Sequence, residues 1–431
     1  MVRPNIVYVH SHDTGRYIQP VGHAVSTPNL QRLAEQGVLF RQAFSAAPTC
    51  SPSRAALLTG QWPHTCGMLG LAHMGSGLND YSHHLANVLK QAGYFTALIG
   101  FQHEAYDQKQ IGYDHLADDA WGRNTASSAV APAAAAFLHG KPRQPFFLSV
   151  GTMETHRGFP PHAPADDPRY CLPPAPIADT PQTRRDMADL KTSARTFDWA
   201  VGTVLAELEA ASLAENTIVI CTTDHGIAFP LIKCNLTDHG IGVFLIMRGP
   251  GGLSGGIACD AMVSQVDVLP TICELIGLEP PAWLQGRSMM PLIRGEADNI
   301  RDELFAEVTY HAAYEPQRCV RTRRWKYIRR FDGRTKPVLV NCDASPTRDA
   351  FLAAGWAARP VAREQFYDLF YDPQEACNLA ADPAHAAVLR EMAARLDRWM
   401  RQTDDPLLKG PVPEPAGPKA HRICSPDAVD L

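Results

Sequence analysis

Four short apolar runs, each followed directly by polar residues, constrain the fold of this 431-residue chain more than any other feature. The runs cover residues 5–10, 94–101, 146–150 and 217–220. Continuous apolar runs of this length are typical of strands buried on both faces of a parallel sheet. Amphipathic helical patterns lie between them. The sequence therefore predicts an α/β fold with a large mixed, mostly parallel sheet sandwiched by helices.

The character of the chain changes near residue 300. Residues 303–309 and 319–331 alternate in polarity like antiparallel strands, and residues 389–400 form an amphipathic pattern typical of a helix. We therefore expect a large domain over residues 1–300. A smaller C-terminal α+β domain carrying an antiparallel sheet would cover residues 301–431.

Composition excludes several classes of protein. A formal net charge of -5 gives no basic field for nucleic acid, and no apolar run is long enough to span a membrane. The first apolar run begins so close to Met1 that we expect no signal peptide and a cytoplasmic protein. The eleven cysteines show no paired spacing, which favours reduced thiols over a structural zinc site. Assembly into a homo-oligomer is left open.

Polar residues with catalytic or metal-binding chemistry follow each of the four runs. In open α/β sheets, ligands bind just beyond the carboxyl ends of the strands. Such positions collect residues from segments that are distant in the sequence. The candidates, in chain order, are His12 and Asp13, then His103, then His156, and finally Asp224 and His225.

One eleven-residue stretch, Cys50-Ser51-Pro52-Ser53-Arg54-Ala55-Ala56-Leu57-Leu58-Thr59-Gly60, resembles the signature of the sulfatase family of the alkaline-phosphatase superfamily. Every fixed position of the pattern Cys-x-Pro-x-Arg-x-x-x-Leu-Thr-Gly is present. The resemblance implies an alkaline-phosphatase-like fold. It also implies that a maturation enzyme oxidises Cys50 to formylglycine, which Arg54 would hold. Taken alone, Cys50 would be interpreted as a buried free thiol at a helix start.

The resemblance also implies one divalent metal ion. Sulfatases carry two adjacent aspartates after the first strand, where this chain has His12 and Asp13, and usually Asp-Asn-Gly where it has Asp224-His225-Gly226. The implied ligands are these four side chains together with the residue derived from Cys50. Imidazole ligands favour manganese or zinc, with calcium as the remaining option.

Three further residues correspond to catalytic positions of the family. His103 ends the segment Gly100-Phe101-Gln102-His103, where the family has Gly-Lys-x-His, so Phe101 replaces a lysine that contacts sulfate. His103 would handle the formylglycine hydroxyl. His156 would be the general acid beside the scissile bond, and Lys233 would contact the sulfate.

Segments near residues 309–311, 318–322 and 325–328 resemble heparan N-sulfatases, which implies that Glu307, His311 and Arg318 contact a sugar. We therefore expect a formylglycine-dependent sulfatase that hydrolyses a sulfate ester or sulfamate, with an N-sulfoglucosamine-like sugar or oligosaccharide as substrate. Because of His225 and Phe101, a phosphonate monoester or phosphodiester hydrolase is an alternative. The departures at His12 and Phe101 also leave open a non-catalytic carbohydrate-binding relative.

Overall fold

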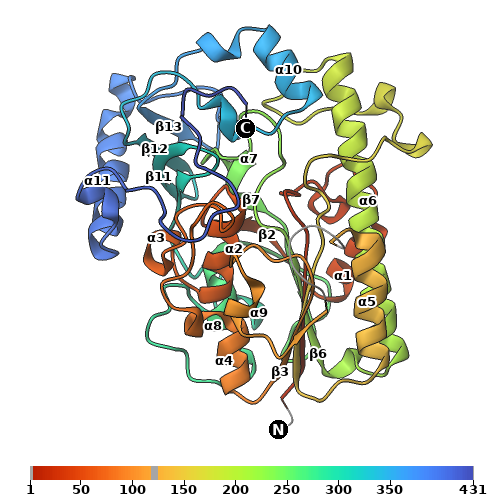
Figure 1. Ribbon diagram of the computed structural model, residues 1–431. Helices are drawn as coiled ribbons and strands as arrows, with labels where there is room; N and C mark the ends of the chain where they lie inside the picture. The colour runs from red at the N-terminus through yellow and green to blue at the C-terminus, as the bar shows by residue number, and fades with distance from the viewer. Residues whose placement is uncertain (1–2, 118–124, 431) are drawn as a thin grey trace.

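The computed structural model describes residues 3–117 and 125–430 and contains two β-sheets (Figure 1). The larger sheet has nine strands and the smaller one has four. Among the described residues, no helix has the length and hydropathy needed to cross a membrane.

The large sheet is mixed and is built around β1, which pairs in parallel with β5 and β6. Strands β3 and β4 extend the parallel part on one side, and antiparallel β8 joins β6 to β2 on the other. In order across the sheet, the strands are β4 (His115–Leu116), β3 (Phe95–Gly100), β5 (Phe146–Gly151), β1 (Asn5–His10), β6 (Thr217–Thr222), β8 (Leu245–Arg248), β2 (Val38–Phe44) and β7 (Gly242–Val243), with β9 (Ile257–Ser264) also paired to β2. The predicted α/β fold is confirmed.

Helices cover both faces of this sheet (Figure 1). One face carries α1 (Pro28–Gln36), α5 (Ser127–His139) and α6 (Pro181–Ala210), and the other carries α2 (Cys50–Thr59), α4 (Leu85–Gln91), α8 (Val268–Leu275) and α9 (Met290–Ile293). Helix α6 begins at Pro181, because Thr180 and Thr183 form a capping box around its first turn.

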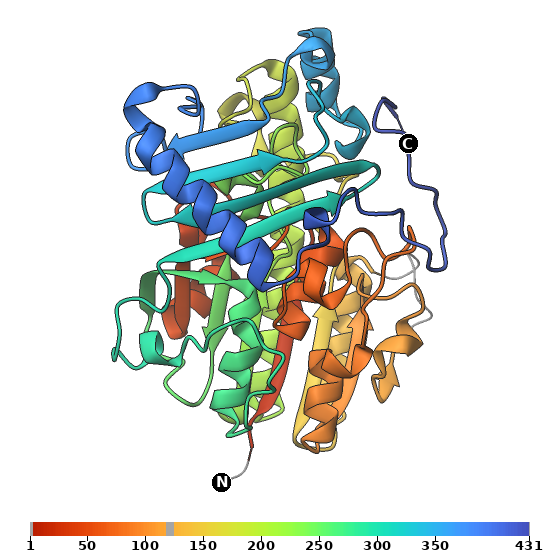
Figure 2. The same ribbon diagram turned by 90° about the vertical axis from the view of Figure 1, so that its left-hand side faces the viewer.

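The small sheet is an antiparallel meander of four consecutive strands. They are β10 (Glu303–Tyr310), β11 (Tyr314–Thr322), β12 (Trp325–Arg330) and β13 (Glu364–Asp368). Helix α11 (Ala386–Gln402) lies across one face of this sheet (Figure 2) and buries Leu396 and Trp399. The predicted antiparallel sheet and closing helix are therefore present. Shorter helices are α3 (Pro63–Cys66), α7 (Asp238–Ile241) and α10 (Pro346–Ala353).

The two sheets are joined by a shared apolar core and by ion pairs. Phe44, at the end of β2, and Leu236, just before α7, pack in one cluster with Leu304 and Ile328 of the small sheet. Close by, the carboxylate of Asp238 in α7 pairs with small-sheet cations. The small sheet is thereby held against the carboxyl ends of the large-sheet strands.

The C-terminal segment, residues 411–430, packs against the loop after α3 and against the turn between β10 and β11. Its backbone hydrogen-bonds to the carbonyls of Gly75, His73 and Ala312, through Gly417, Ala420 and Cys424 respectively. These bonds fix the last part of the chain along one wall of the region where the strand-end residues meet.

Candidate active site

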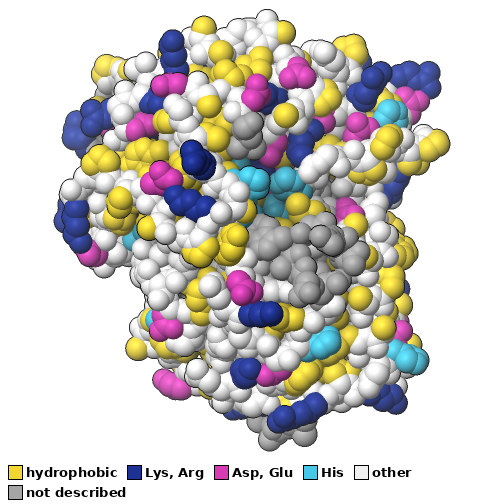
Figure 3. Space-filling model, in the orientation of Figure 1, with side chains coloured by type: hydrophobic (Ala, Val, Ile, Leu, Met, Phe, Trp, Pro, Cys, Tyr) yellow, Lys and Arg dark blue, Asp and Glu magenta, His cyan; other side chains and the backbone are white. Residues whose placement is uncertain are grey.

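The polar residues predicted at the strand ends converge beside the first turn of α2. Strands β1, β5 and β6 are adjacent and parallel, so the residues that follow them meet at one edge of the sheet. Histidine side chains gather in a hollow on the face shown in Figure 3. The small sheet and the C-terminal segment border this region.

Five buried side chains form the centre of the site: His12, Asp13, Cys50, Asp224 and His225. One potential ligand atom from each lies within 4.8 Å of all the others. His12 Nδ1 lies 2.8 Å from Asp13 Oδ1 and 3.3 Å from Asp224 Oδ2. His225 Nε2 lies 3.1 Å from Asp13 Oδ1 and 3.3 Å from the Sγ of Cys50. The sequence-predicted metal ligands are therefore neighbours in the structure.

Asp224 is held by Arg54, which is fully buried. Arg54 donates to Asp224 Oδ2 through Nε at 3.2 Å and through Nη2 at 3.0 Å, and it contacts His10 Nδ1 at 2.6 Å. Burial opposes ionisation of Asp224, but His12 and Arg54 outweigh it and hold the pKa of Asp224 below its usual range. In this structure Arg54 thus orients the carboxylate of Asp224, one of the predicted metal ligands. Its predicted contact with a formylglycine remains a prediction.

Asp13 is held in the same way by Lys233. The Nζ of Lys233 lies 2.9 Å from Asp13 Oδ2 and 3.0 Å from Asp343 Oδ2. Burial would raise the pKa of Asp13, but Lys233, with help from His12 and His225, holds it well below its usual range. The backbone of Asp13 is left-handed, with φ of 54°, a strained conformation that occurs often at functional sites.

The buried donors fit a divalent cation. Burial lowers the pKa of His12 to about 4, so its imidazole is neutral at pH 7 and keeps a lone pair for a metal. Asp13 and Asp224 are ionised under the same conditions. Two carboxylates and two imidazoles in close contact form a mixed oxygen and nitrogen ligand set.

The Cys50 thiol is poorly suited to act as a nucleophile without modification. Burial raises its pKa well above the usual value, although the charge of Lys233 opposes the shift. The thiol is therefore protonated at neutral pH. Cys50 is the first residue of α2, where unpaired backbone N–H groups favour an anion.

Two further histidines predicted as catalytic, the partly exposed His156 and the buried His103, lie beside this centre. His156 Nε2 is 4.0 Å from Asp13 Oδ2, and its ring packs edge-on against His12 at 4.6 Å between centroids. His103 Nε2 lies 2.9 Å from His73 Nδ1, and the two rings stack. Phe101, which replaces the family lysine, packs its ring against His12 and beneath the guanidinium of Arg54.

Glu307 and Arg318, which the resemblance places at a sugar, are engaged with other protein groups in the structure. Both side chains are buried, with exposed fractions of 1% and 0%, and they pair with each other at 3.1 Å. Arg318 also pairs with Asp405, and Glu307 accepts from His64. They therefore join β10 and β11 to neighbouring segments, and these contacts occupy both side chains. His311, in contrast, is close enough to Lys233 for that charge to add to burial in lowering its pKa to about 3.

Sequence reasoning missed three residues that support the site: His10, His73 and Asp343. His10 ends β1 and contacts Arg54, so a histidine within an otherwise apolar strand was a usable signal. His73 and Asp343 lie in irregular segments and meet their partners only through tertiary contacts. No local pattern marks either of them.

Comparisons with known proteins agree on one family. The family model described as Sulfatase matches residues 4–278, and one described as N-sulphoglucosamine sulphohydrolase, C-terminal, matches residues 232–349. Human N-sulphoglucosamine sulphohydrolase is 30% identical over 449 residues, covering 90% of this chain and 88% of that protein. An ulvan-active sulfatase from Formosa agariphila is 27% identical over 473 residues, covering 94% and 76%.

A similar solved structure extends the comparison to the fold. It is that of a protein in complex with its substrate D-glucosamine-2-N,6-O-disulfate, with a TM-score of 0.75 and 19% identity. The match covers 95% of this chain and 99% of the other. At this identity the likeness concerns the arrangement of the two sheets and their helices.

Proposed function

Because this chain belongs to the sulfatase family, we propose that it hydrolyses the sulfate ester or sulfamate of a sugar, with N-sulfoglucosamine-like residues as the foremost substrates. Family membership confirms the predicted hydrolase class. The substrate is supported by the C-terminal family match and by the similarity to human N-sulphoglucosamine sulphohydrolase. The observation that carries the proposal is the position of Cys50, buried among His225, Asp13 and Asp224 at the start of α2.

The proposed nucleophile is a formylglycine made from Cys50 by a maturation enzyme. A hydrated aldehyde offers one hydroxyl to attack sulfur and a second to drive elimination, which a thiol cannot do. The high pKa of the Cys50 thiol agrees with this proposal, because the unmodified side chain is protonated. Arg54 and Lys233 keep Asp224 and Asp13 ionised and fixed in place around residue 50.

His12, Asp13, Asp224 and His225 would hold one divalent ion together with the oxygen of residue 50. Such an ion supplies Lewis-acid stabilisation of charge on the sulfuryl oxygens. Lys233 adds a fixed positive charge on the opposite side of Asp13. The protein therefore surrounds the sulfate position with cationic groups before substrate arrives.

The histidines supply the proton transfers. His156 is partly exposed and lies beside Asp13, where it can donate a proton to the departing oxygen or nitrogen. His103 is held by His73 and would remove a proton from the hydroxyl that drives release of sulfate. Each histidine therefore has a separate role beside the central cluster.

A substrate comparison tests the proposal. We expect the kcat/KM for N-sulfoglucosamine to exceed that for a phosphodiester such as bis(p-nitrophenyl) phosphate by at least about 100-fold, roughly 3 kcal/mol of transition-state stabilisation. The rate on glucosamine 6-sulfate, compared with the rate on N-sulfoglucosamine, measures the preference for an N-sulfate over an O-sulfate. The phosphodiester is included because Phe101 replaces the family lysine that contacts sulfate, so the site has one positive charge fewer than the family pattern. A faster phosphodiester reaction would overturn the proposed substrate.

Metal removal should also be decisive. We expect chelation to reduce activity by at least about 100-fold, because Asp13 and Asp224 are then left without the cation that organises them. Manganese or zinc should restore it, since two of the four side-chain ligands are imidazoles. Elemental analysis identifies the native ion. Full recovery with calcium alone would contradict this choice of metal.

A further inference from the structure

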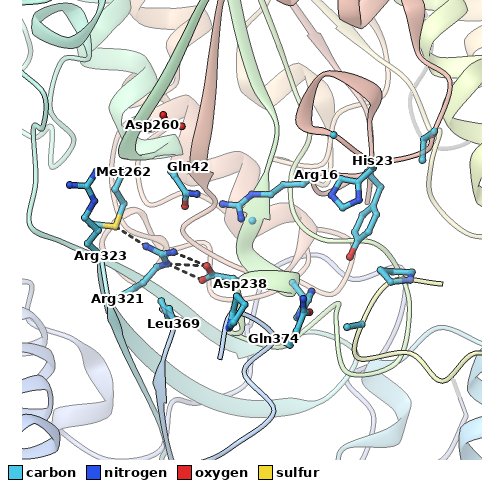
Figure 4. A pocket seen from close by; sticks show the side chains of 18 of the residues that line it. Arg16, His23, Gln42, Asp238, Asp260, Met262, Arg321, Arg323, Leu369 and Gln374 are labelled. Carbon is cyan, nitrogen blue, oxygen red and sulfur yellow. Dashed lines mark hydrogen bonds and ion pairs between the residues drawn. The ribbon is translucent and has the colours of Figure 1, made fainter. Parts of the chain in front are cut away.

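A second cavity, of about 1010 Å³, lies between the edge of the large sheet and the small sheet. Its walls include Arg16 from the loop after β1, Gln42 of β2, Asp238 of α7, Arg321 of β11 and Gln374 (Figure 4). None of the five central site residues lines it. The cavity is therefore separate from the proposed active site.

Arg16 brings a positive charge to this cavity without a matching carboxylate. Within the described ranges it forms no ion pair, and its one hydrogen bond runs from Nη2 to the carbonyl of Ala43 at 3.1 Å. Its guanidinium lies over the ring of Phe44 at 4.5 Å, and Arg321 lies over the same ring at 4.3 Å. Two guanidinium groups thus share one buried aromatic ring.

The neighbouring carboxylates are already committed to other cations. Asp238 pairs with Arg321 and with Lys326, each at 2.8 Å, and Glu375 lies 3.2 Å from Lys326. Burial raises the pKa of Glu375 to about 7, although Lys326 opposes the shift. Of these groups, Arg16, Arg321 and Asp238 line the cavity, so two guanidinium groups face one carboxylate, which Lys326 also pairs from behind the wall. The inner wall of the cavity carries excess positive charge.

The other side chains that line the cavity can contact the hydroxyl groups and the ring of a sugar. Gln42 and Gln374 offer neutral amide donors and acceptors, and the exposed side chain of Tyr170 lies at the mouth. The other lining carboxylates, Asp260, Asp298 and Asp302, are exposed, so water screens their charges.

We propose that this cavity is a second, non-catalytic binding site for a sugar unit that carries one sulfate or carboxylate group. The anionic group would bind to the guanidinium of Arg16, as arginine commonly binds planar or tetrahedral oxyanions. The sugar hydroxyls would bind to Gln42 and Gln374. This site depends on no residue of the proposed reaction.

Calorimetric titration of the Cys50→Ala protein, which cannot turn over a sulfate ester, tests the proposal. The probes are glucose 6-sulfate and glucuronate, with glucose as the uncharged control. We expect at least one charged probe to bind at the cavity, and a crystal soaked with it to show the anionic group at Arg16. Binding of glucose 6-sulfate alone would assign the site to sulfate, and binding of glucuronate alone would assign it to carboxylate.

Two variants locate the binding. Arg16→Gln, which removes the charge but keeps a polar side chain, should weaken binding of the charged probe to this site about tenfold or more. Ala24→Trp should block the cavity from an exposed lining position without altering Arg16. Arg323→Gln is the matched control, since Arg323 also lines the cavity but lies at the exposed rim. Unchanged binding in both test variants, or density only beside residue 50, would overturn the proposal.

Discussion

The Cys50→Ala variant is expected to lose all measurable hydrolysis while keeping its fold. Cys50 occupies the first position of α2 and is 2% exposed, so alanine removes the only side chain there that can become an aldehyde. Alanine also favours a helix, and the lost sulfur leaves a small change in volume. Circular dichroism and thermal unfolding check the fold, and hydrolysis of a sugar sulfate measures the activity.

A matched substitution separates this effect from general thiol chemistry. Cys66 is also buried, in α3, but its thiol donates to the carbonyl of Pro63 and lies outside the central cluster. Cys66→Ala should therefore remain active. Mass measurement of the active-site peptide from the parent protein should show a loss of about 18 Da at residue 50 if the cysteine is converted. An active Cys50→Ala protein would refute the assigned nucleophile.

The His156→Ala variant is expected to lose roughly 100-fold or more in kcat on a sugar sulfamate, and much less on an activated aryl sulfate. A poor leaving group needs a proton as it departs, whereas an activated phenolate departs without one. His156 is suited to this role because its Nε2 lies beside Asp13 and its side chain is 24% exposed. The ratio of the two losses, measured under saturating substrate, is the informative quantity.

His162 provides the control for this experiment. It lies in the same loop region, but its Nδ1 is 2.8 Å from Asp189 of α6, outside the central cluster. His162→Ala should change both rates little. Equal losses on the two substrates in His156→Ala would show that His156 positions other groups and does not act as the acid.

The strands and the residues that follow them could be predicted because both depend on local sequence. Residues 6–9 are continuously apolar, and the strand extends one residue beyond them at each end, to Asn5 and His10. Parallel neighbours then bring their carboxyl ends together, so His12, Asp13, Asp224 and His225 could be expected to meet. The same local rules missed α5, whose interior contains Pro132, a residue that normally argues against a helix.

Other features depend on tertiary contacts that leave no local trace. Strand β9 was missed because its first half is largely exposed and only its second half is buried. Glu307 and Arg318 were assigned to a sugar by the resemblance to heparan N-sulfatases, and no local pattern shows that they pair with each other in the fold. The pairing of Lys233 with Asp343 spans more than a hundred residues and likewise could not be predicted.

The C-terminal segment supplies part of the wall around residue 50. Ile423 and Cys424 pack against the cluster that contains Cys50, Leu71 and Ala313, and the backbone of Ala420 bonds to His73. A nascent chain still attached to the ribosome can form its N-terminal strands but lacks this wall. Enclosure of residue 50 on this side therefore requires residues 420–424, which are synthesised long after the strands that carry the other site residues.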